Sequence, residues 1–179
     1  MLRITIPATE FYDERSETFV KAKEQTLQLE HSLVSLSKWE SKWCKPFLSD
    51  KEKTEEEVMD YIKCMTITQN VDPAVYQCLT AEHFKQIEEY IDAPMTATTF
   101  ADNRGGSNRE QVTSELIYYW MVSYNIPFEC QKWHLNRLIT LVRVCGVKNQ
   151  PAKKMSKREI MDRNRALNAQ RRQQLNTRG

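Results

Sequence analysis

Few residues in this 179-residue chain combine the types and the spacing that chemistry requires. Cys130 and His134 are four residues apart in a segment predicted to be helical, so both side chains would face the same way. Such a pair suits a Cys–His nucleophile or half of a metal site. No second ligand pair or orienting residue accompanies it, and Trp133 and Leu135 flank it. We therefore interpret the pair as part of a packed helix.

Other signatures of catalysis and of cofactor binding are missing from the sequence. Gly105-Gly106 lies in a predicted loop and lacks the GxxxxGK[ST] spacing of a phosphate-binding loop. The five cysteines show no CxxC spacing, which argues against a zinc site and a disulfide framework. Thr54 and Glu57 are spaced as a helix capping box, and the acidic run Glu55–Glu57 is typical of a solvated helix start. The sequence therefore predicts no enzyme, no cofactor and no metal.

The strongest functional signal is the uneven distribution of charge. Residues 148–179 carry ten Lys and Arg against two acids, so this segment is near +8. Because the whole chain is +2, residues 1–147 are near −6. A basic segment joined to an acidic body usually contacts something negative. The candidate electrostatic contacts are Arg158, Arg163, Arg165, Arg171 and Arg172.

Three interpretations of this basic arm stay open. Its cations could neutralise the phosphates of a nucleic acid, which would make binding steeply dependent on salt. The segment contains no aromatic residue, so stacking on single-stranded bases is unsupported. The same cations could instead dock on an acidic protein surface, including the body of a neighbouring copy. The third interpretation is a solvated tail.

Four aromatic residues are the candidates for apolar contact with a partner: Trp39, Trp43, Tyr119 and Trp120. Trp39 and Trp43 share one face of a predicted helix. Tyr118-Tyr119-Trp120 places rings around most of the circumference of another. A helix that is apolar on more than one side is either central in the core or used for association. Both roles remain open for these residues.

The periodicity of the apolar residues divides the chain into three parts. Residues 1–31 alternate between apolar and polar, which predicts short antiparallel strands. Residues 32–147 show helical periods, including a predicted helix from residue 127 to about Val144. Residues 148–179 form the basic arm, where Ser156 and Glu159 are spaced as a helix capping box. We expect an α+β, mainly α protein, with a small N-terminal antiparallel β ribbon packed on a helical body and a basic, helix-capable C-terminal arm.

Membrane association is not indicated by the sequence. The longest apolar stretches, such as Leu116–Val122, are far too short to span a bilayer. The first residues lack the basic-then-apolar order of a secretory signal. We therefore expect a soluble cytoplasmic protein with no membrane partner.

Several segments are similar to one known family. These are Leu33–Glu40, Met95–Phe100, Lys132–Leu141, Ala152–Ser156 and Arg165–Arg172. Together they resemble small proteins encoded in the tail modules of long-tailed bacteriophages, and most closely the tail assembly chaperone-like proteins. The resemblance covers most of the chain and rests on packing-type sequences.

The resemblance implies a non-enzymatic protein of phage tail morphogenesis that acts through protein–protein contacts. Its expected partners are the tape-measure protein and tail-tube proteins, together with further copies of itself. The expected location is the host cytoplasm during phage assembly, or the virion. A structural component of the tail or connector is the first alternative, and a nucleic-acid-binding accessory protein that uses the basic arm is the second.

Overall fold

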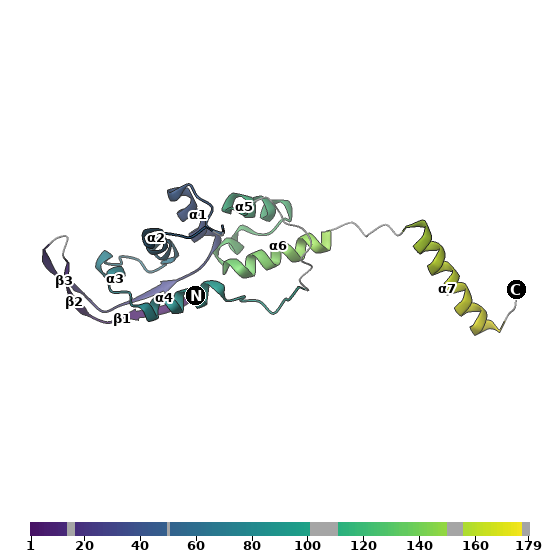
Figure 1. Cartoon of the computed structure of the whole chain (residues 1–179), viewed down its shortest axis with the longest axis horizontal. Coiled ribbons are helices and arrows are strands. Elements are labelled where there is room, and N and C mark those ends of the chain that lie inside the picture. The colour runs from purple at the N-terminus through teal and green to yellow at the C-terminus, as the bar shows by residue number, and fades with distance from the viewer. Residues whose placement is uncertain (14–16, 50, 101–110, 150–155, 177–179) are drawn as a thin grey trace. The chain divides into compact units, whose positions relative to one another are not determined.

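The computed structural model describes residues 1–13, 17–49, 51–100, 111–149 and 156–176. The chain divides into two compact units, Met1–Gly146 and Val147–Gly179. The first unit contains a β ribbon and a helical body, and the second contains one long helix (Figure 1). The fold is therefore α+β and mainly α, as the sequence predicted. The loop predicted around Gly105-Gly106 lies outside the described residues.

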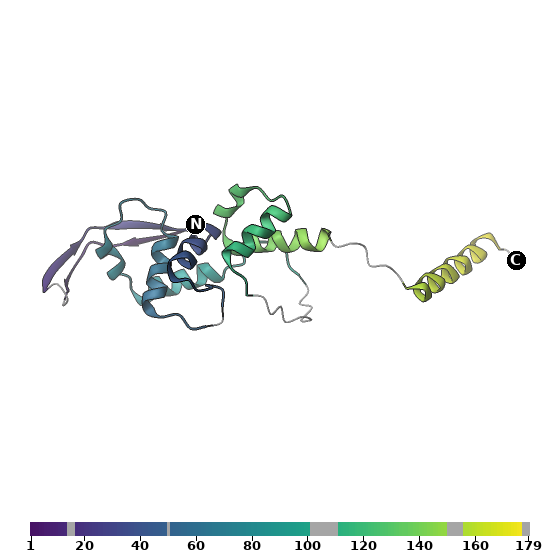
Figure 2. The same cartoon turned by 90° about the horizontal axis from the view of Figure 1, so that it is seen from above.

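The N-terminal ribbon is one long hairpin in a single register. Strand β1 (Leu2–Ile6) pairs with β4 (Gln25–Leu29), and β2 (Thr9–Asp13) pairs with β3 (Thr18–Ala22). Leu2 faces Leu29 at one end and Asp13 faces Thr18 at the other, and the pairs of the two halves share one register. The break between the two halves includes Pro7, which has no N–H to donate to a partner strand. The half formed by β2 and β3 extends past the helices (Figure 2).

The half formed by β1 and β4 belongs to the core. Ile4, Ile6, Leu27 and Leu29 are buried on its inner face, whereas Arg3 and Thr5 point outward. This alternation follows from the two-residue period of a strand. The outer edge of β4 is covered by residues 65–67, through hydrogen bonds between Glu30 and Met65 (2.9 Å) and between Ile67 and Gln28 (2.8 Å).

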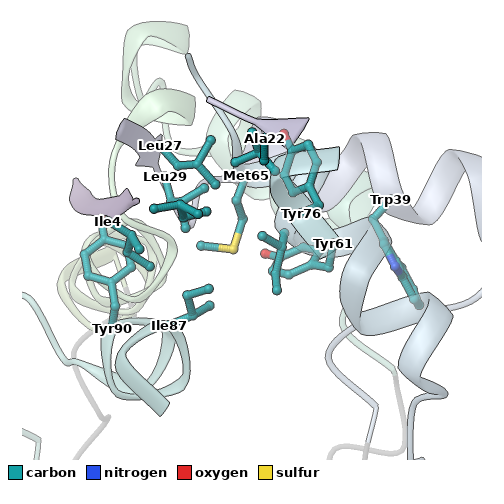
Figure 3. Close-up of a cluster of buried hydrophobic side chains, with 13 residues drawn as sticks. Ile4, Ala22, Leu27, Leu29, Trp39, Tyr61, Met65, Tyr76, Ile87 and Tyr90 are labelled. Carbon is teal, nitrogen blue, oxygen red and sulfur yellow. The ribbon is translucent and has the colours of Figure 1, made fainter. Parts of the chain in front are cut away.

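Four helices complete the first hydrophobic cluster. They are α1 (Leu33–Trp43), α2 (Glu55–Met65), α3 (Pro73–Gln77) and α4 (Ala81–Asp92). Each begins at a side-chain cap that satisfies a free backbone N–H, and α2 has the full capping box of Thr54 and Glu57 that the sequence predicts. Met65 lies in the middle of this cluster, between Leu29 and Tyr61 (Figure 3).

A second hydrophobic cluster joins α1 to the remaining helices of the first unit. It is built by α5 (Ser114–Ser123), the 3-10 helix η1 (Phe128–Lys132) and α6 (Leu135–Asn149). Helix α1 contributes Leu33 and Leu36 to this cluster and Trp39 to the first. Its position between the two clusters explains why α1 is buried on more than one side.

The predicted single helix from residue 127 to Val144 is wrong. The backbone is extended at Trp133, where the ψ angle is 162°, and α6 begins at Leu135. Two interactions hold it there: Ser32 forms a β-bridge with His134, and Leu135 donates to the carbonyl of His31 at 2.7 Å. These tertiary contacts override the local helical pattern.

The second unit contains α7 (Lys157–Leu175). Ser156 accepts a hydrogen bond from Glu159 N–H, and the Glu159 carboxylate accepts one from Ser156 N–H. This is the capping box predicted from the sequence. No residue of α7 is buried.

Candidate partner-binding surfaces

The aromatic residues of α1 lie inside the protein. Trp39 is 1% exposed, packs edge-on against Phe47 and Tyr61, and donates its indole N–H to the carbonyl of Glu57 at 2.8 Å. Trp43 is half-buried, and its indole N–H donates to Asp60 at 2.9 Å. Both indoles thus have hydrogen-bond partners within the fold. The Trp39 ring offers no surface to a partner, although the sequence made Trp39 a candidate for apolar contact.

Helix α5 exposes apolar side chains on the side away from the core. Ile117 and Met121 are buried on its inner side. Tyr119 is 64% exposed and Val122 is 60% exposed, and these two residues define the α5 outer face. A helix with large apolar residues on both its inner and its outer side is typical of an association surface. Tyr119 is therefore accessible to a partner, as a residue proposed for apolar contact must be.

Neighbouring aromatic residues extend the apolar surface beyond α5. Phe128 on η1 is 55% exposed, and its ring centroid lies 6.5 Å from that of Tyr118. The Tyr118 hydroxyl donates to Gln131 at 2.9 Å, which fixes the ring against η1. Burial raises the pKa of Tyr118, so the phenol stays neutral. Trp120 is half-buried against the second cluster and contributes packing as well as an accessible edge.

A second apolar surface is the groove between α2 and α4, with a volume of about 310 Å³. Its floor is formed by Tyr61, Ile62 and Ile87, which are each at most 3% exposed. Its remaining lining residues are Phe47, Lys53, Val58, Phe84, Glu88 and Ile91. We call this set of nine residues the α2–α4 groove.

The floor of the α2–α4 groove is held in place by ring stacking and by a buried hydrogen bond. Phe47 stacks on Tyr61 with ring centroids 3.8 Å apart. The Tyr61 hydroxyl shares a hydrogen bond of 2.7 Å with Nδ1 of His31. Burial, with a smaller contribution from His134, lowers the pKa of His31 to about 4, so this imidazole is neutral at pH 7. Burial also raises the pKa of Tyr61 well above its usual value.

The C-terminal end of α4 is fixed by residues at the start of α6 and just before it. The Asn136 side-chain amide donates to the carbonyls of Ile91 and Ala93, both at 2.9 Å. Asn136 N–H donates to Nδ1 of His134 at 3.3 Å, so Nε2 carries the proton and donates to the carbonyl of Tyr90 at 2.9 Å. These bonds satisfy carbonyls that a helix end otherwise leaves free, and they set the position of Ile91 in the groove.

The helices beside the groove present an acidic surface. Six acids are exposed on them, against the two lysines Lys63 and Lys85; the acids are Glu55, Glu56, Glu82, Glu88, Glu89 and Asp92. Lys53 lies at the Phe47 end of the groove, with its Nζ 4.6 Å from the centroid of the Phe47 ring. The other two acids of α2 are buried and paired, Glu57 with Lys45 and Asp60 with Lys42. Among the residues that line the groove, Glu88 is the one acid. The acidic character therefore belongs to the exposed surfaces of α2 and α4 as a whole, which suit a basic partner.

All five arginines selected from the sequence lie on α7, where every residue is exposed: Arg158, Arg163, Arg165, Arg171 and Arg172. The helix also carries apolar residues, of which Ile160 is 45% exposed and Leu167 is 41% exposed. These two are seven residues apart and therefore share one face of the helix. Helix α7 is thus a basic helix with a narrow apolar stripe.

The Cys130–His134 pair is not brought together for chemistry. Cys130 is buried in η1, and His134 precedes α6 with both ring nitrogens hydrogen-bonded elsewhere. Within residues 1–13, 17–49, 51–100, 111–149 and 156–176, no group of three or more His, Cys, Asp or Glu residues is placed to hold a metal ion. Across the same residues, no helix combines the length and the apolar character that a membrane span needs.

The α2–α4 groove was not identified from the sequence. Val58 and Phe84 each continue the three- and four-residue spacing of the apolar residues in their helices, so the sequence alone does not separate them from core residues. Periodicity gives the side of a helix that is apolar, but not whether a third element covers that side.

Comparison with known proteins adds no assignment, since no family model, no curated protein and no solved structure matches the chain.

Proposed function

We propose that this chain is a non-enzymatic protein of phage tail morphogenesis, acting as an assembly chaperone for the tape-measure protein. The observation that carries the proposal is the α5 outer face, where Tyr119 and Val122 are exposed while the other side of the same helix packs in the core. A tape-measure protein is long, helical and prone to aggregate, so it needs a protein that shields its apolar stripes. An exposed apolar helix face binds such a stripe by helix-against-helix packing.

Two further features support a role in binding. The exposed basic helix α7 supplies charge that steers a partner and speeds association. The resemblance of Lys132–Leu141 and Arg165–Arg172 to tail assembly chaperone-like proteins points to the same class. In this role the protein acts in the host cytoplasm while tails assemble, and recruits tail-tube subunits around the tape-measure protein.

A structural component of the tail or connector would use the same surfaces but would stay in the finished particle. Probing purified virions for the chain separates these two roles, since a chaperone leaves before the particle is complete. A nucleic-acid-binding accessory protein is the alternative favoured by α7 alone, because its arginines are all exposed. Phosphate binding predicts a loss of about 0.9 log units of affinity per contact for each tenfold rise in salt.

The proposal is tested by tagging the full chain in cells that produce the phage and identifying the proteins that co-purify after nuclease treatment. We expect tape-measure or tail-tube proteins to be recovered. Recovery should fall when Tyr119 and Val122 are both changed to Ser, and persist when exposed Ile67 on another part of the first unit is changed to Ser. Recovery of nucleic acid alone, lost on nuclease treatment, would contradict the proposal.

A further inference from the structure

The α2–α4 groove is not used by the proposed function, and its shape and charge describe a ligand. Helix α4 lines it with Phe84, Ile87, Glu88 and Ile91, and the first and last of these are seven residues, or about 10 Å of helix, apart. Val58 of α2 lines the other side, next to the buried Ile62 of the floor. A groove of this length between two helices accommodates a third helix that inserts side chains at positions i and i+7.

Helix α7 has the matching pattern. Ile160 and Leu167 are seven residues apart, again about 10 Å of helix, and both are exposed. Asn164 and Arg171 continue the same face, and the surrounding residues are predominantly basic. A lone helix with so narrow an apolar stripe gains stability by packing that stripe on a complementary surface.

The charges of the two surfaces are complementary. Exposed residues of α2 and α4 comprise six acids and two lysines. Helix α7 has six Lys and Arg against two acids. We propose that the α2–α4 groove binds α7 of a second copy of this chain, with Ile160 and Leu167 inserted and basic residues of α7 facing the acids of α2 and α4. Opposite charges would set the orientation, and apolar burial would supply most of the affinity.

This contact joins two different surfaces, so a bound pair keeps one groove and one α7 free for further neighbours. Repetition of such a heterologous contact builds a ring or an open array of copies. An array would place successive α5 outer faces along a long helical partner. The self-association does not require that partner, so it can be tested apart from the proposed function.

The decisive experiment mixes two full-length variants that each lack one half of the contact. Val58→Arg/Glu88→Lys fills the groove and reverses its charge, whereas Ile160→Asp/Leu167→Asp removes the apolar stripe of α7. All four side chains are exposed, so the substitutions leave the core intact. Matched controls carry the same types of change elsewhere. They are Ile67→Arg/Glu129→Lys on the first unit and Ala166→Asp/Ala169→Asp on the opposite face of α7.

Sedimentation equilibrium at low salt measures the outcome, and thermal melting checks that each variant is folded. We expect the wild-type chain and both controls to form oligomers that grow with concentration, and each variant alone to be monomeric. Their equimolar mixture should form a 1:1 dimer, because one intact groove meets one intact α7. A monomeric wild-type chain would overturn the inference, as would folded variants that still self-associate alone or fail to pair when mixed.

A labelled peptide of residues 156–176 gives a second measurement that does not depend on how a double variant folds. Fluorescence anisotropy should show this peptide binding the full-length Ile160→Asp/Leu167→Asp chain, whose groove is free. The single change Glu88→Lys, added to that chain, should weaken binding by at least about tenfold. Absence of peptide binding, or binding unaffected by Glu88→Lys, would overturn the inference even if tail proteins co-purify with the chain.

Discussion

Helices α1 and α5 both carry closely spaced aromatic residues, yet the fold uses them in different ways. Helix α1 lies between the two hydrophobic clusters, so Trp39 is 1% exposed and both of its tryptophans hydrogen-bond to α2. Helix α5 is covered on one side, and Tyr119 on the other side is 64% exposed. The number of neighbouring elements therefore decides whether an aromatic stripe builds the core or offers a binding surface.

The largest expected effect comes from removing the central ring of α1. Trp39→Ala leaves a cavity beside Phe47 and Tyr61 and should lower the free energy of unfolding by about 3–5 kcal/mol. Urea denaturation followed by circular dichroism measures this loss. A loss below about 1 kcal/mol would mean that Trp39 is not the buried centre of the α1 packing.

The buried histidine next to α1 should make stability depend on pH. Burial, with a smaller contribution from His134, lowers the pKa of His31 to about 4, whereas an unfolded His titrates near 6.5. The folded state therefore favours neutral His31. This stabilisation is complete above pH 6.5 and is lost as the pH falls towards 4, by roughly 3 kcal/mol.

Denaturant titrations of the wild type and of His31→Gln are compared at pH 7 and pH 4.5. The comparison separates the stabilisation due to neutral His31 from the contribution of the carboxylates. The wild type should lose more stability than the variant over this interval. Equal losses for wild type and His31→Gln would contradict the account.

A smaller effect is expected where α1 is tied to α2 by polar contacts. Asp60 accepts hydrogen bonds from Trp43 and Lys42. Burial raises its pKa, but these hydrogen bonds outweigh burial and hold the pKa below its usual value. Asp60→Asn keeps the shape and removes the charge, so it should cost about 1–2 kcal/mol, measured by thermal melting. A variant as stable as the wild type would show that these bonds only orient Trp43.

The smallest effect on stability is expected on the α5 outer face. Tyr119→Ser/Val122→Ser removes exposed apolar surface and should change the free energy of unfolding by less than about 0.5 kcal/mol per residue. Under the proposed function, the same variant should recover less tape-measure or tail-tube protein in a co-purification experiment. A strongly destabilised variant would place these residues in the core, and the contrast with α1 would fail.

The sequence predicted the local features of the fold well. The alternation of Ile4 and Ile6 gave the inner face of the ribbon, and the caps at Thr54 and Ser156 gave the starts of α2 and α7. These features depend on residues that are close in the sequence, so they can be recognised from the sequence alone. The break before α6 could not be recognised, because it depends on the bridge between Ser32 and His134, which lie about a hundred residues apart.

The candidate surfaces were predicted in part, for the same reason. Tyr119 and the five arginines of α7 are accessible, whereas Trp39 is enclosed by Phe47 and Tyr61. Spacing identifies an aromatic face of a helix, but burial depends on which distant element packs against it. The α2–α4 groove was missed because nothing in either helix alone indicates that the space between them is left open.

Site-specific photo-crosslinking from the α5 outer face tests the central claim most directly. A photoreactive phenylalanine analogue would replace Tyr119 in one strain and exposed Ile67 in a matched strain, both in cells that produce the phage. The account predicts a crosslink from position 119 to the tape-measure protein and none from position 67. Absence of any tail-protein crosslink at position 119, or equal crosslinking at both positions, would contradict the claim that α5 holds the partner.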